Sequence, residues 1–443
     1  MHTPPLPCRL LAALLVTAVL LMTGVTARAA DDPQVVRARE ILALLTGGRY
    51  AEFVACGDAT MQAKFSADQA RQVWNGLSFQ LGVYRAEESA QPVRAGGFDA
   101  VRFVLRFERG TCTLRVVLDA SGKMSGFWCE AVNPAVEYQP PAYVDPDAFR
   151  EESVTVSAGR FPLPGTLTLP KKSGPFAAVV LVHGSGPHDA DETVGANKPF
   201  RDLAWGLATR GIAVLRYEKR TKAHPLAKPA AEWTPADETI DDALAAVQVL
   251  RKRDDIDPRR VYILGHSLGG MLAPYMARQD ERLAGIIILA GNARSILDVI
   301  EDQTEYLARL GGEPAEQDRA ELARLMERLA AVRAGKAADT EPILGVPAVY
   351  WERLHKLDPA GTAAQLKLPI LVLQGGRDYQ VTRKDFAVWE ERLHGRDNAR
   401  LKLLDNLNHL FVAGEGRSTP AEYEQAGHVD ATVIALIADW IGR

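Results

Sequence analysis

The chain has 443 residues, of which 47% are apolar and 24% are charged, and its formal net charge is -4 at pH 7. This length exceeds one ordinary domain, and the apolar share is enough to build sizeable cores. Lysine and arginine are interspersed with aspartate and glutamate, which argues against nucleic acid and an anionic membrane surface as partners. A small neutral substrate fits this charge pattern better.

Residues 1–29 have the three regions of a secretory signal peptide. Arg9 precedes the apolar stretch 10–22, and small residues around Ala29 follow it. Cleavage after Ala29 would leave a periplasmic or secreted protein. The alternative is a retained membrane anchor, which needs about 20 apolar residues, whereas this stretch has roughly 13. No later stretch is longer, so we expect no stable membrane insertion after signal removal.

Residues 30–140 predict a small α+β domain in which helices precede strands. Helical patterns cover residues 35–45 and 50–74, and strand patterns separated by turns with glycine cover 79–84, 99–107, 111–118 and 124–132. This order is typical of helices packed on an antiparallel sheet. With Phe53, Phe65, Trp74 and Gly82 in place, it resembles the small domain of unknown function that precedes some bacterial secreted esterases. Substrate presentation and dimerisation are both open as its role.

Three cysteines follow the predicted signal peptide, Cys56, Cys112 and Cys129. An exported protein folds in an oxidising compartment, where cysteines can pair. A hairpin with its turn at residues 119–122 places Cys112 opposite Cys129, so a disulfide between them is possible. The alternative is two reduced cysteines buried as small apolar side chains.

The proline-rich segment 141–150 predicts a linker to a second domain, residues 151–443. Eight strand candidates follow, at residues 153–157, 165–169, 177–182, 212–216, 261–264, 285–290, 369–374 and 400–404. From the third onward they are short apolar runs that alternate with helical segments such as 200–210 and 239–253. This pattern predicts a mostly parallel sheet covered on both faces, with ligands at the carboxyl ends of the strands.

Strand patterns stop between Ala290 and Pro369, where residues 295–310 and 314–333 have the apolar spacing of amphipathic helices. We expect an inserted helical cap at about residues 291–365. The apolar side chains of its first helix either line a substrate pocket or pack against other helices; they are Leu297, Ile300, Tyr306, Leu307 and Leu310.

The segment Gly-His-Ser-Leu-Gly at residues 265–269 predicts a nucleophile elbow, because a buried-type strand precedes it and a helical run follows it. Such an elbow holds the nucleophile, here Ser267, at the apex of a tight turn. Gly265 and Gly269 lie where strand and helix approach most closely, so a side chain at either position would collide. The alternative is an ordinary strand-to-helix turn that matches the pattern by chance.

A serine hydroxyl needs a base within hydrogen-bond reach, and that base needs an orienting acid. In folds with such an elbow, the triad residues follow along the chain in the order serine, acid, histidine. The acid lies after a late strand, and the histidine lies after the last strand. Asp378 and His409 occupy those two loops, so we assign them as acid and base. Asp405 is the rival acid, but it precedes His409 by only four residues on the same loop. The other histidines after Ser267 lie in helical segments; they are His355, His394 and His428.

Acyl transfer also needs N–H donors for the oxyanion that forms on the substrate carbonyl. The backbone N–H of Leu268 is one candidate. The second comes from the glycine-rich segment 183–186 after the third strand, with Ser185 as first choice and Gly186 as second. The alternative is a glycine-rich turn with no role.

Two charged segments lie near these motifs. Residues 188–192, His-Asp-Ala-Asp-Glu, predict a solvated loop rather than a metal site, because no second ligand cluster of suitable spacing accompanies them. Residues 216–220, Arg-Tyr-Glu-Lys-Arg, are expected to shape the rim of the cleft rather than to bind phosphate.

The second domain, residues 151–443, resembles the alpha/beta-hydrolases. The segments 183–187, 197–200, 216–220 and 265–270 are similar to those of a bacterial esterase group that also resembles serine peptidases. The resemblance implies hydrolysis of carboxylic esters with small or short acyl groups through an acyl-enzyme, without metal or organic cofactor. Amide or aminoacyl substrates stay open, although no propeller-like domain is visible in the first 150 residues. A non-catalytic binding protein is the alternative from another class, and the oligomeric state is not predicted.

Overall fold

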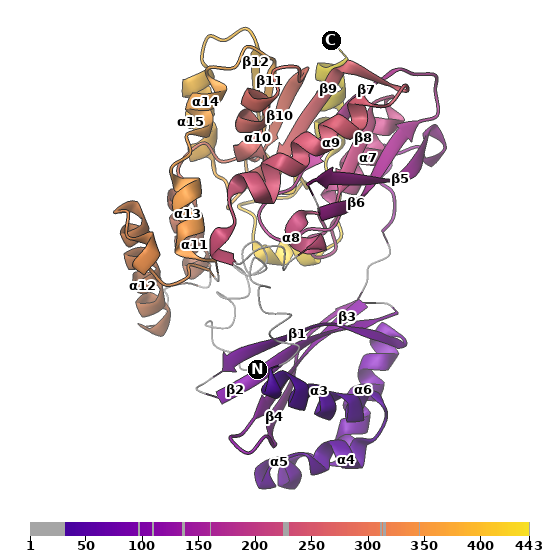
Figure 1. The fold of residues 1–443 in the computed structure, drawn as a ribbon, viewed down its shortest axis with the longest axis vertical. Coiled ribbons are helices and arrows are strands. Elements are labelled where there is room, and N and C mark those ends of the chain that lie inside the picture. Colours follow the sequence, from indigo (N-terminus) through magenta and orange to yellow (C-terminus); the bar gives the residue numbers. More distant parts are fainter. Residues whose placement is uncertain are drawn as a thin grey trace. The chain divides into compact units, whose positions relative to one another are not determined.

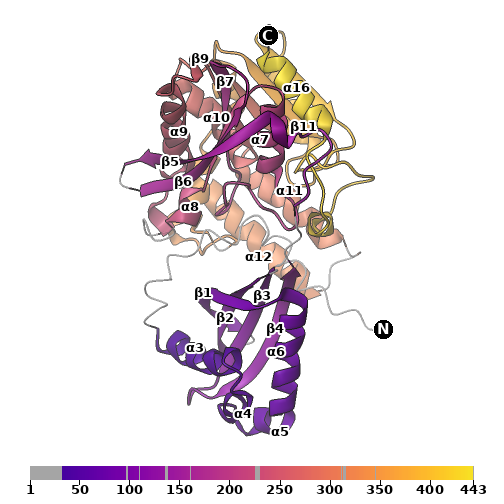
Figure 2. The ribbon, with the colours of Figure 1, turned by 90° about the vertical axis from the view of Figure 1, so that its right-hand side faces the viewer.

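The computed structural model describes residues 32–442, apart from residues 96–97, 109, 135–137, 160, 225–229, 311, 313–315 and 345. The predicted signal peptide, residues 1–29, lies outside the described residues. The described chain forms two compact units that divide between Tyr138 and Gln139, and both are drawn in Figures 1 and 2.

The N-terminal unit begins with helices, as predicted. They are α3 (Pro33–Thr46), α4 (Tyr50–Ala55), α5 (Ala59–Lys64) and α6 (Ala67–Leu81). Asp32 caps α3 by accepting a hydrogen bond from the backbone N–H of Gln34 at 2.8 Å. Ser66 and Gln69 form a capping box at the start of α6, and Gly82, with φ +79°, ends this helix.

A four-stranded antiparallel sheet completes the N-terminal unit, in the order β1-β2-β3-β4. Its strands are β1 (Tyr84–Ala95), β2 (Phe98–Phe107), β3 (Gly110–Leu118) and β4 (Met124–Pro134). Val101, Phe103 and Leu105 alternate along β2 and are fully buried, because they pack with helix residues such as Ile41 and Trp74 in one core. The predicted α+β arrangement is therefore confirmed.

The prediction of a strand at residues 79–84 is wrong. Helix α6 continues to Leu81, and β1 begins only at Tyr84. The segment that forms β1 contains Pro92, which cannot donate a backbone hydrogen bond and is tolerated because β1 is an edge strand. A proline within a polar segment hid this strand from sequence analysis.

The prediction that Cys112 lies opposite Cys129 is also wrong. A register shift between Thr113 and Leu114 pairs Cys129 with Leu114 and Cys112 with Val132. The two sulfur atoms are 3.5 Å apart, which is longer than the S–S bond of about 2.05 Å. Both cysteines are free thiols, Cys112 buried and Cys129 exposed, so the possible disulfide is not formed in this structure.

The second unit is built on an eight-stranded sheet in the order β12-β11-β10-β9-β7-β8-β6-β5. Its strands are β5 (Phe149–Ala158), β6 (Phe161–Pro170), β7 (Phe176–Val182), β8 (Ala213–Tyr217), β9 (Ile256–His266), β10 (Gly285–Leu289), β11 (Ile370–Gly375) and β12 (Ala399–Leu404). The strands from β12 to β8 in this order are parallel to one another. Strand β6 pairs antiparallel with both of its neighbours, β8 and β5. The predicted mostly parallel sheet is confirmed.

Helices cover both faces of this sheet (Figures 1 and 2). They are α7 (Pro199–Thr209), α9 (Asp241–Arg251), α10 (Leu268–Gln279), α15 (Arg383–Leu393) and α16 (Ala431–Ile441). On one face, Val180 of β7 shares a core with Met271 of α10 and Trp389 of α15. On the other face, Val179 shares a core with Phe200 of α7. Successive residues of one strand therefore serve opposite cores, which is why the central strands are apolar throughout.

Shorter elements join these helices and strands. They are η1 (Pro146–Ala148), α8 (Arg220–Ala223), η2 (Ala230–Glu232), η3 (Ala236–Ile240), η4 (Ala337–Asp339) and η5 (Pro420–Glu424). Among them, η3 is a short π-helix that leads into α9 and carries the buried residue Glu238.

Helices also fill the segment between β10 and β11, as predicted. They are α11 (Ile296–Arg309), α12 (Glu316–Arg333), α13 (Ala348–His355) and α14 (Pro359–Ala363). Leu297 and Ile300 of α11 are buried in the large core, whereas Leu310 is exposed. In the part of the chain that the structure describes, no helix combines the length and apolar character needed to cross a bilayer.

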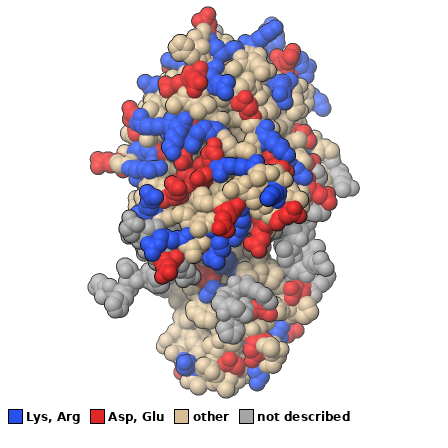
Figure 3. All heavy atoms as spheres, turned by 90° about the vertical axis from the view of Figure 1, so that its left-hand side faces the viewer, with Lys and Arg blue, Asp and Glu red and all other residues tan. Residues whose placement is uncertain are grey.

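Figure 3 shows one face of the molecule, where lysine and arginine side chains are mixed with aspartate and glutamate side chains. Mixed charge of this kind keeps a surface hydrated without creating a strong field of one sign.

Candidate active site

Ser267 lies between β9, which ends at His266, and α10, which begins at Leu268. Its backbone has φ +51° and ψ -116°, a conformation that residues with a side chain rarely adopt. A Cβ atom at Gly265 would lie 2.2 Å from the carbonyl carbon of Gly269, and one at Gly269 would lie 2.3 Å from the carbonyl oxygen of Val182. The turn has the tight geometry of a nucleophile elbow, and both glycines are required by sterics.

The loop after β7 lies directly against this turn. β7 and β9 are parallel neighbours, so their carboxyl ends meet at one edge of the sheet. A Cβ atom at Gly184 would lie 3.1 Å from the Cβ atom of Ser267. The two oxyanion candidates of this loop, Ser185 and Gly186, therefore follow a residue that touches the elbow, and Gly186 has φ +101°.

Leu268 is the first residue of α10. Its N–H therefore lies in the first turn of the helix, where backbone N–H groups have no carbonyl partner within the helix. This is the arrangement that an oxyanion donor needs, and the helix dipole adds a partial positive charge at the same end.

His409 and Asp378 meet in the interior, with His409 Nδ1 2.7 Å from Asp378 Oδ2. Asp378 Oδ1 accepts hydrogen bonds from the backbone N–H groups of Gln380 at 2.7 Å and Val381 at 3.0 Å. Gln374 Nε2 donates to Asp378 Oδ2 at 3.1 Å. These donors fix the position of the carboxylate, and its contact with Nδ1 of His409 orients the imidazole ring.

His409 Nε2 is the nitrogen left for chemistry. It is buried and has no hydrogen-bond partner among the described residues. With Nδ1 committed to Asp378, Nε2 carries the lone pair that can accept a proton from a serine hydroxyl.

The loops of the acid and the histidine are in contact. A Cβ atom at Gly375 would lie 2.5 Å from the carbonyl oxygen of Asn408. Asn408 Oδ1 accepts hydrogen bonds from the N–H groups of Leu410 and Val412, each at 3.0 Å, and so holds the histidine loop in shape. A glycine directly after β11 therefore allows the two loops to meet.

The rival residues lie elsewhere. The side chain of Asp405 is 78% exposed and pairs with Arg383. His355 ends α13, His394 follows α15, and His428 Nδ1 lies 3.1 Å from Asp202. The structure brings Asp378 to His409 and leaves these residues outside the pair.

The acidic loop 188–192 is half-buried at its first three residues and buried at its last two, so the prediction that it is solvated is wrong. Asp191 and Glu192 are only 7% and 1% exposed. Asp191 Oδ1 accepts a hydrogen bond from Arg216 Nε at 3.0 Å, and Asp191 Oδ2 lies 2.6 Å from Arg201. Asp191 is paired with arginines and Glu192 with His266, and the described residues contain no group of three side chains that could hold a metal ion.

Glu192 joins three loops of the site. Its Oε1 accepts the backbone N–H of Gly184 at 2.6 Å, and its Oε2 lies 2.9 Å from His266 Nδ1. His266 Nε2 lies 2.9 Å from the backbone oxygen of His409. His266, at the end of β9, thus supports the histidine loop.

Segment 216–220 is also buried and does not form a cleft rim. Arg216, Lys219 and Arg220 are all buried, and Lys219 is only 2% exposed. Lys219 Nζ donates a hydrogen bond to the backbone oxygen of Gly184 at 2.7 Å. The contact of Lys219 with the Gly184 backbone was not predicted. The one feature of the sequence that could have indicated it is the cluster of cations directly after a buried strand.

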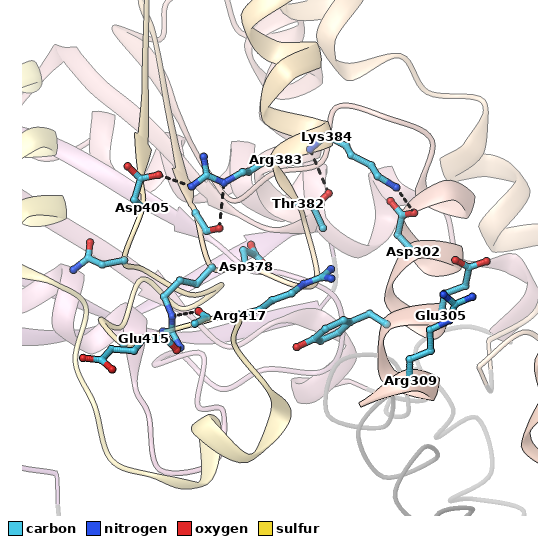
Figure 4. A pocket seen from close by; sticks show the side chains of 16 residues that line it. Asp302, Glu305, Arg309, Asp378, Thr382, Arg383, Lys384, Asp405, Glu415 and Arg417 are labelled. Carbon is cyan, nitrogen blue, oxygen red and sulfur yellow. Dashed lines mark hydrogen bonds and ion pairs between the residues drawn. The ribbon is translucent and has the colours of Figure 1, made fainter. Parts of the chain in front are cut away.

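A cavity of about 1030 Å³ lies beside the acid loop (Figure 4). Tyr306 of α11, Asp378 and charged residues of neighbouring loops line it. Lys384 Nζ lies 2.8 Å from Asp302, and the guanidinium of Arg417 lies 3.8 Å from the ring centroid of Tyr306. Its polar walls are largely satisfied by one another, and Ser267 is not among its lining residues.

Residues 173–415, more than half of the chain, match the family model described as serine aminopeptidase, S33. The chain belongs to this family. Esterase EstD of Thermotoga maritima is 42% identical over 384 residues, which are 86% of this chain and 89% of that protein. Residues 38–127 match a second model, described as a protein of unknown function (DUF3887). The second unit of this S33-family chain therefore has the alpha/beta-hydrolase fold that the sequence predicted.

Two solved structures show a more distant similarity to this S33-family chain. Acylaminoacyl peptidase of Pyrococcus horikoshii is 14% identical with a TM-score of 0.48, over 82% of this chain and 56% of that protein. Est1E of Butyrivibrio proteoclasticus is 15% identical with a TM-score of 0.42, over 65% of this chain and 95% of that protein. The chain thus spans little more than half the length of the peptidase.

Replacement of Asp378 by asparagine should greatly lower kcat while leaving the fold intact. An amide at this position favours the wrong tautomer of His409, and in triads of this type the change lowers kcat by about 10⁴-fold. Hydrolysis of an activated ester measures the effect. The control is Asp405→Asn, which should leave the rate unchanged because Asp405 is exposed. Equal losses in the two variants would contradict the assignment of Asp378.

The Glu192–His266 pair ties stability to pH. Burial opposes the charge on Glu192, but His266 outweighs it and lowers the pKa of Glu192 from 4.5 to about 2. Burial also opposes the charge on His266, but Glu192 outweighs it and raises the pKa of His266 above 6.5. The contribution of Glu192 is therefore present above pH 4.5 and lost as the pH falls towards 2. The contribution of His266 is present below pH 6.5 and lost as the pH rises through its raised pKa.

Glu192→Gln should destabilise the protein most between pH 4.5 and pH 6.5, where both partners are charged. Denaturant unfolding of the parent and the variant, from about pH 3 to about pH 9, gives the difference in unfolding free energy. Glu424→Gln, at an exposed position, is the control and should show a small, constant difference. A difference for Glu192→Gln that does not change with pH would contradict the ion pair.

Proposed function

We propose that this protein is a carboxylesterase that hydrolyses esters with small or short acyl groups through an acyl-enzyme. The observation that carries the proposal is the buried Asp378–His409 pair, whose free Nε2 belongs to a site that also holds a strained serine elbow. The 42% identity with an esterase over most of both chains supports an ester as the substrate.

Each predicted residue has a defined role in this mechanism. Ser267 Oγ attacks the ester carbonyl while His409 Nε2 takes the hydroxyl proton. The oxyanion that forms is stabilised by the backbone N–H groups of Leu268 and Ser185. His409 then gives its proton to the departing alcohol, which leaves an acyl group on Ser267. A water molecule, activated by the same nitrogen, releases the acid.

A serine peptidase that cleaves aminoacyl amides is the second candidate. The family description, serine aminopeptidase, favours it. Esters need less assistance to the leaving group than amides, so an acyl-enzyme site of this geometry acts on esters first. In addition, the described residues before Gln139 form a small α+β unit with one four-stranded sheet rather than a propeller.

Ser267 should be the one serine that reacts with a fluorophosphonate probe. The parent protein is labelled and the modified peptide is identified by mass spectrometry. Ser267→Ala should abolish both labelling and ester hydrolysis, because the variant lacks the proposed nucleophile. Ser157→Ala, at an exposed position on β5, is the control and should label like the parent. An unlabelled but folded parent that still binds esters would favour a non-catalytic binding protein.

The same preparation separates ester from amide substrates. p-Nitrophenyl esters of increasing acyl length are compared with aminoacyl p-nitroanilides. We expect kcat/KM to be higher for the esters and to fall as the acyl chain lengthens. Faster cleavage of the anilides would favour the peptidase.

We also propose that the protein is exported to the periplasm or the medium. The support is the sequence pattern of residues 1–29, with Arg9, the apolar stretch 10–22 and the small residues that end at Ala29. Cell fractionation after expression of the full chain should place the protein outside the cytoplasm, and N-terminal sequencing should begin at Ala30. A cytoplasmic protein that keeps its first 29 residues would refute the proposal.

A further inference from the structure

The backbone of Gly184 is held on both sides by buried ionisable side chains. Its carbonyl oxygen accepts a hydrogen bond from Lys219 Nζ at 2.7 Å, and its N–H donates to Glu192 Oε1 at 2.6 Å. Lys219 and Glu192 are 2% and 1% exposed. Because a Cβ atom at Gly184 would lie 3.1 Å from that of Ser267, these contacts are made directly beside the elbow.

Lys219 is held by a second buried carboxylate. Its Nζ lies 2.6 Å from Glu238 Oε1, and Glu238 also accepts a hydrogen bond from the hydroxyl of Tyr350 in α13. A buried ammonium is costly unless an opposite charge compensates it, and such a pair is on average no more stabilising than apolar side chains. Stability alone therefore does not explain why Lys219 and Glu238 are buried as a pair. The hydrogen bond from Lys219 to the Gly184 carbonyl points to a role in holding this backbone.

The contact at the Gly184 carbonyl also orients the N–H group of Ser185, because both belong to the same peptide group. A trans peptide is planar, so its C=O and N–H bonds point in opposite directions. With the Gly184 oxygen fixed on Lys219, the Ser185 N–H must point away from Lys219. Without this hydrogen bond the peptide can rotate, and a carbonyl lone pair then replaces the N–H donor.

We propose that Lys219 is a positioning residue of the oxyanion hole, which holds the Gly184–Ser185 peptide so that the Ser185 N–H faces the oxyanion. The inference rests on the proposed function, because it assumes acyl transfer by Ser267. The ammonium also draws electron density from the Gly184 carbonyl and so strengthens the Ser185 N–H as a donor. Glu238 pairs with Lys219 in the interior, and Glu192 holds the preceding N–H.

The test removes both charges of the pair together, in Lys219→Met/Glu238→Gln, so that no uncompensated charge stays buried. Loss of a whole oxyanion donor costs about 10²–10³-fold in kcat, so a misaligned donor should cost about 10- to 100-fold. KM should change little, because the oxyanion exists only after attack. An aryl trifluoromethyl ketone, which forms an oxyanion on Ser267, should bind more weakly by the same factor as kcat falls.

Arg251→Met/Asp280→Asn is the matched control. It removes another largely buried ion pair of the same unit, between α9 and the end of α10. A comparable fall in melting temperature is expected, with kcat and affinity for the ketone unchanged.

Each outcome has a defined meaning. A folded Lys219→Met/Glu238→Gln variant with the parent's kcat, or with reduced kcat but unchanged ketone affinity, would overturn the positioning role. If this variant does not fold, Lys219→Leu/Glu238→Gln replaces it, and ketone affinity equal to that of the parent would again overturn the role. Complete but slower fluorophosphonate labelling of Ser267 supports the proposal, whereas an unlabelled Ser267 in the parent would refute the proposed function itself.

Discussion

The close approach of three backbone segments at one point sets the geometry of this protein. Gly269 at the start of α10 packs against the carbonyl oxygen of Val182 at the end of β7, and Gly265 packs against Gly269. No side chain fits at either glycine, and the turn between them forces Ser267 into a strained conformation. Because β7, β9, β11 and β12 are parallel, the loops that carry the oxyanion candidates, the acid and the histidine all leave the same edge of the sheet.

Beneath these loops, ionisable side chains are buried beside the apolar cores. Glu192, His266, Lys219 and Glu238 are buried and linked in pairs, and each pair holds backbone groups of a site loop. A loop without regular secondary structure gains no ladder of hydrogen bonds, so buried ionic side chains take over the task of fixing it. The strain at Ser267 persists because its surroundings are held in this way.

Local patterns in the sequence predict most of the fold and the reactive pair. From the third strand onward, the strands of the large sheet are apparent because buried parallel strands are short apolar runs, and the fixed chain order of the fold selects Asp378 and His409. The errors share one cause, which is contact between distant residues. Glu192 is buried by partners from β9, Cys129 is displaced by a bulge in its hairpin, and β1 is paired by β2 despite Pro92. None of these contacts leaves a periodic signal in the segment concerned.

Strand β12 closes the large sheet at one end and presents an unpaired row of backbone groups there. Arg400 and Lys402 are exposed on this strand, alternating with partly buried neighbours. Two such strands from separate molecules would bring like charges face to face, and this opposes edge-to-edge association of the sheets. The strand that leads to the loop of His409 thus also carries charges that oppose aggregation.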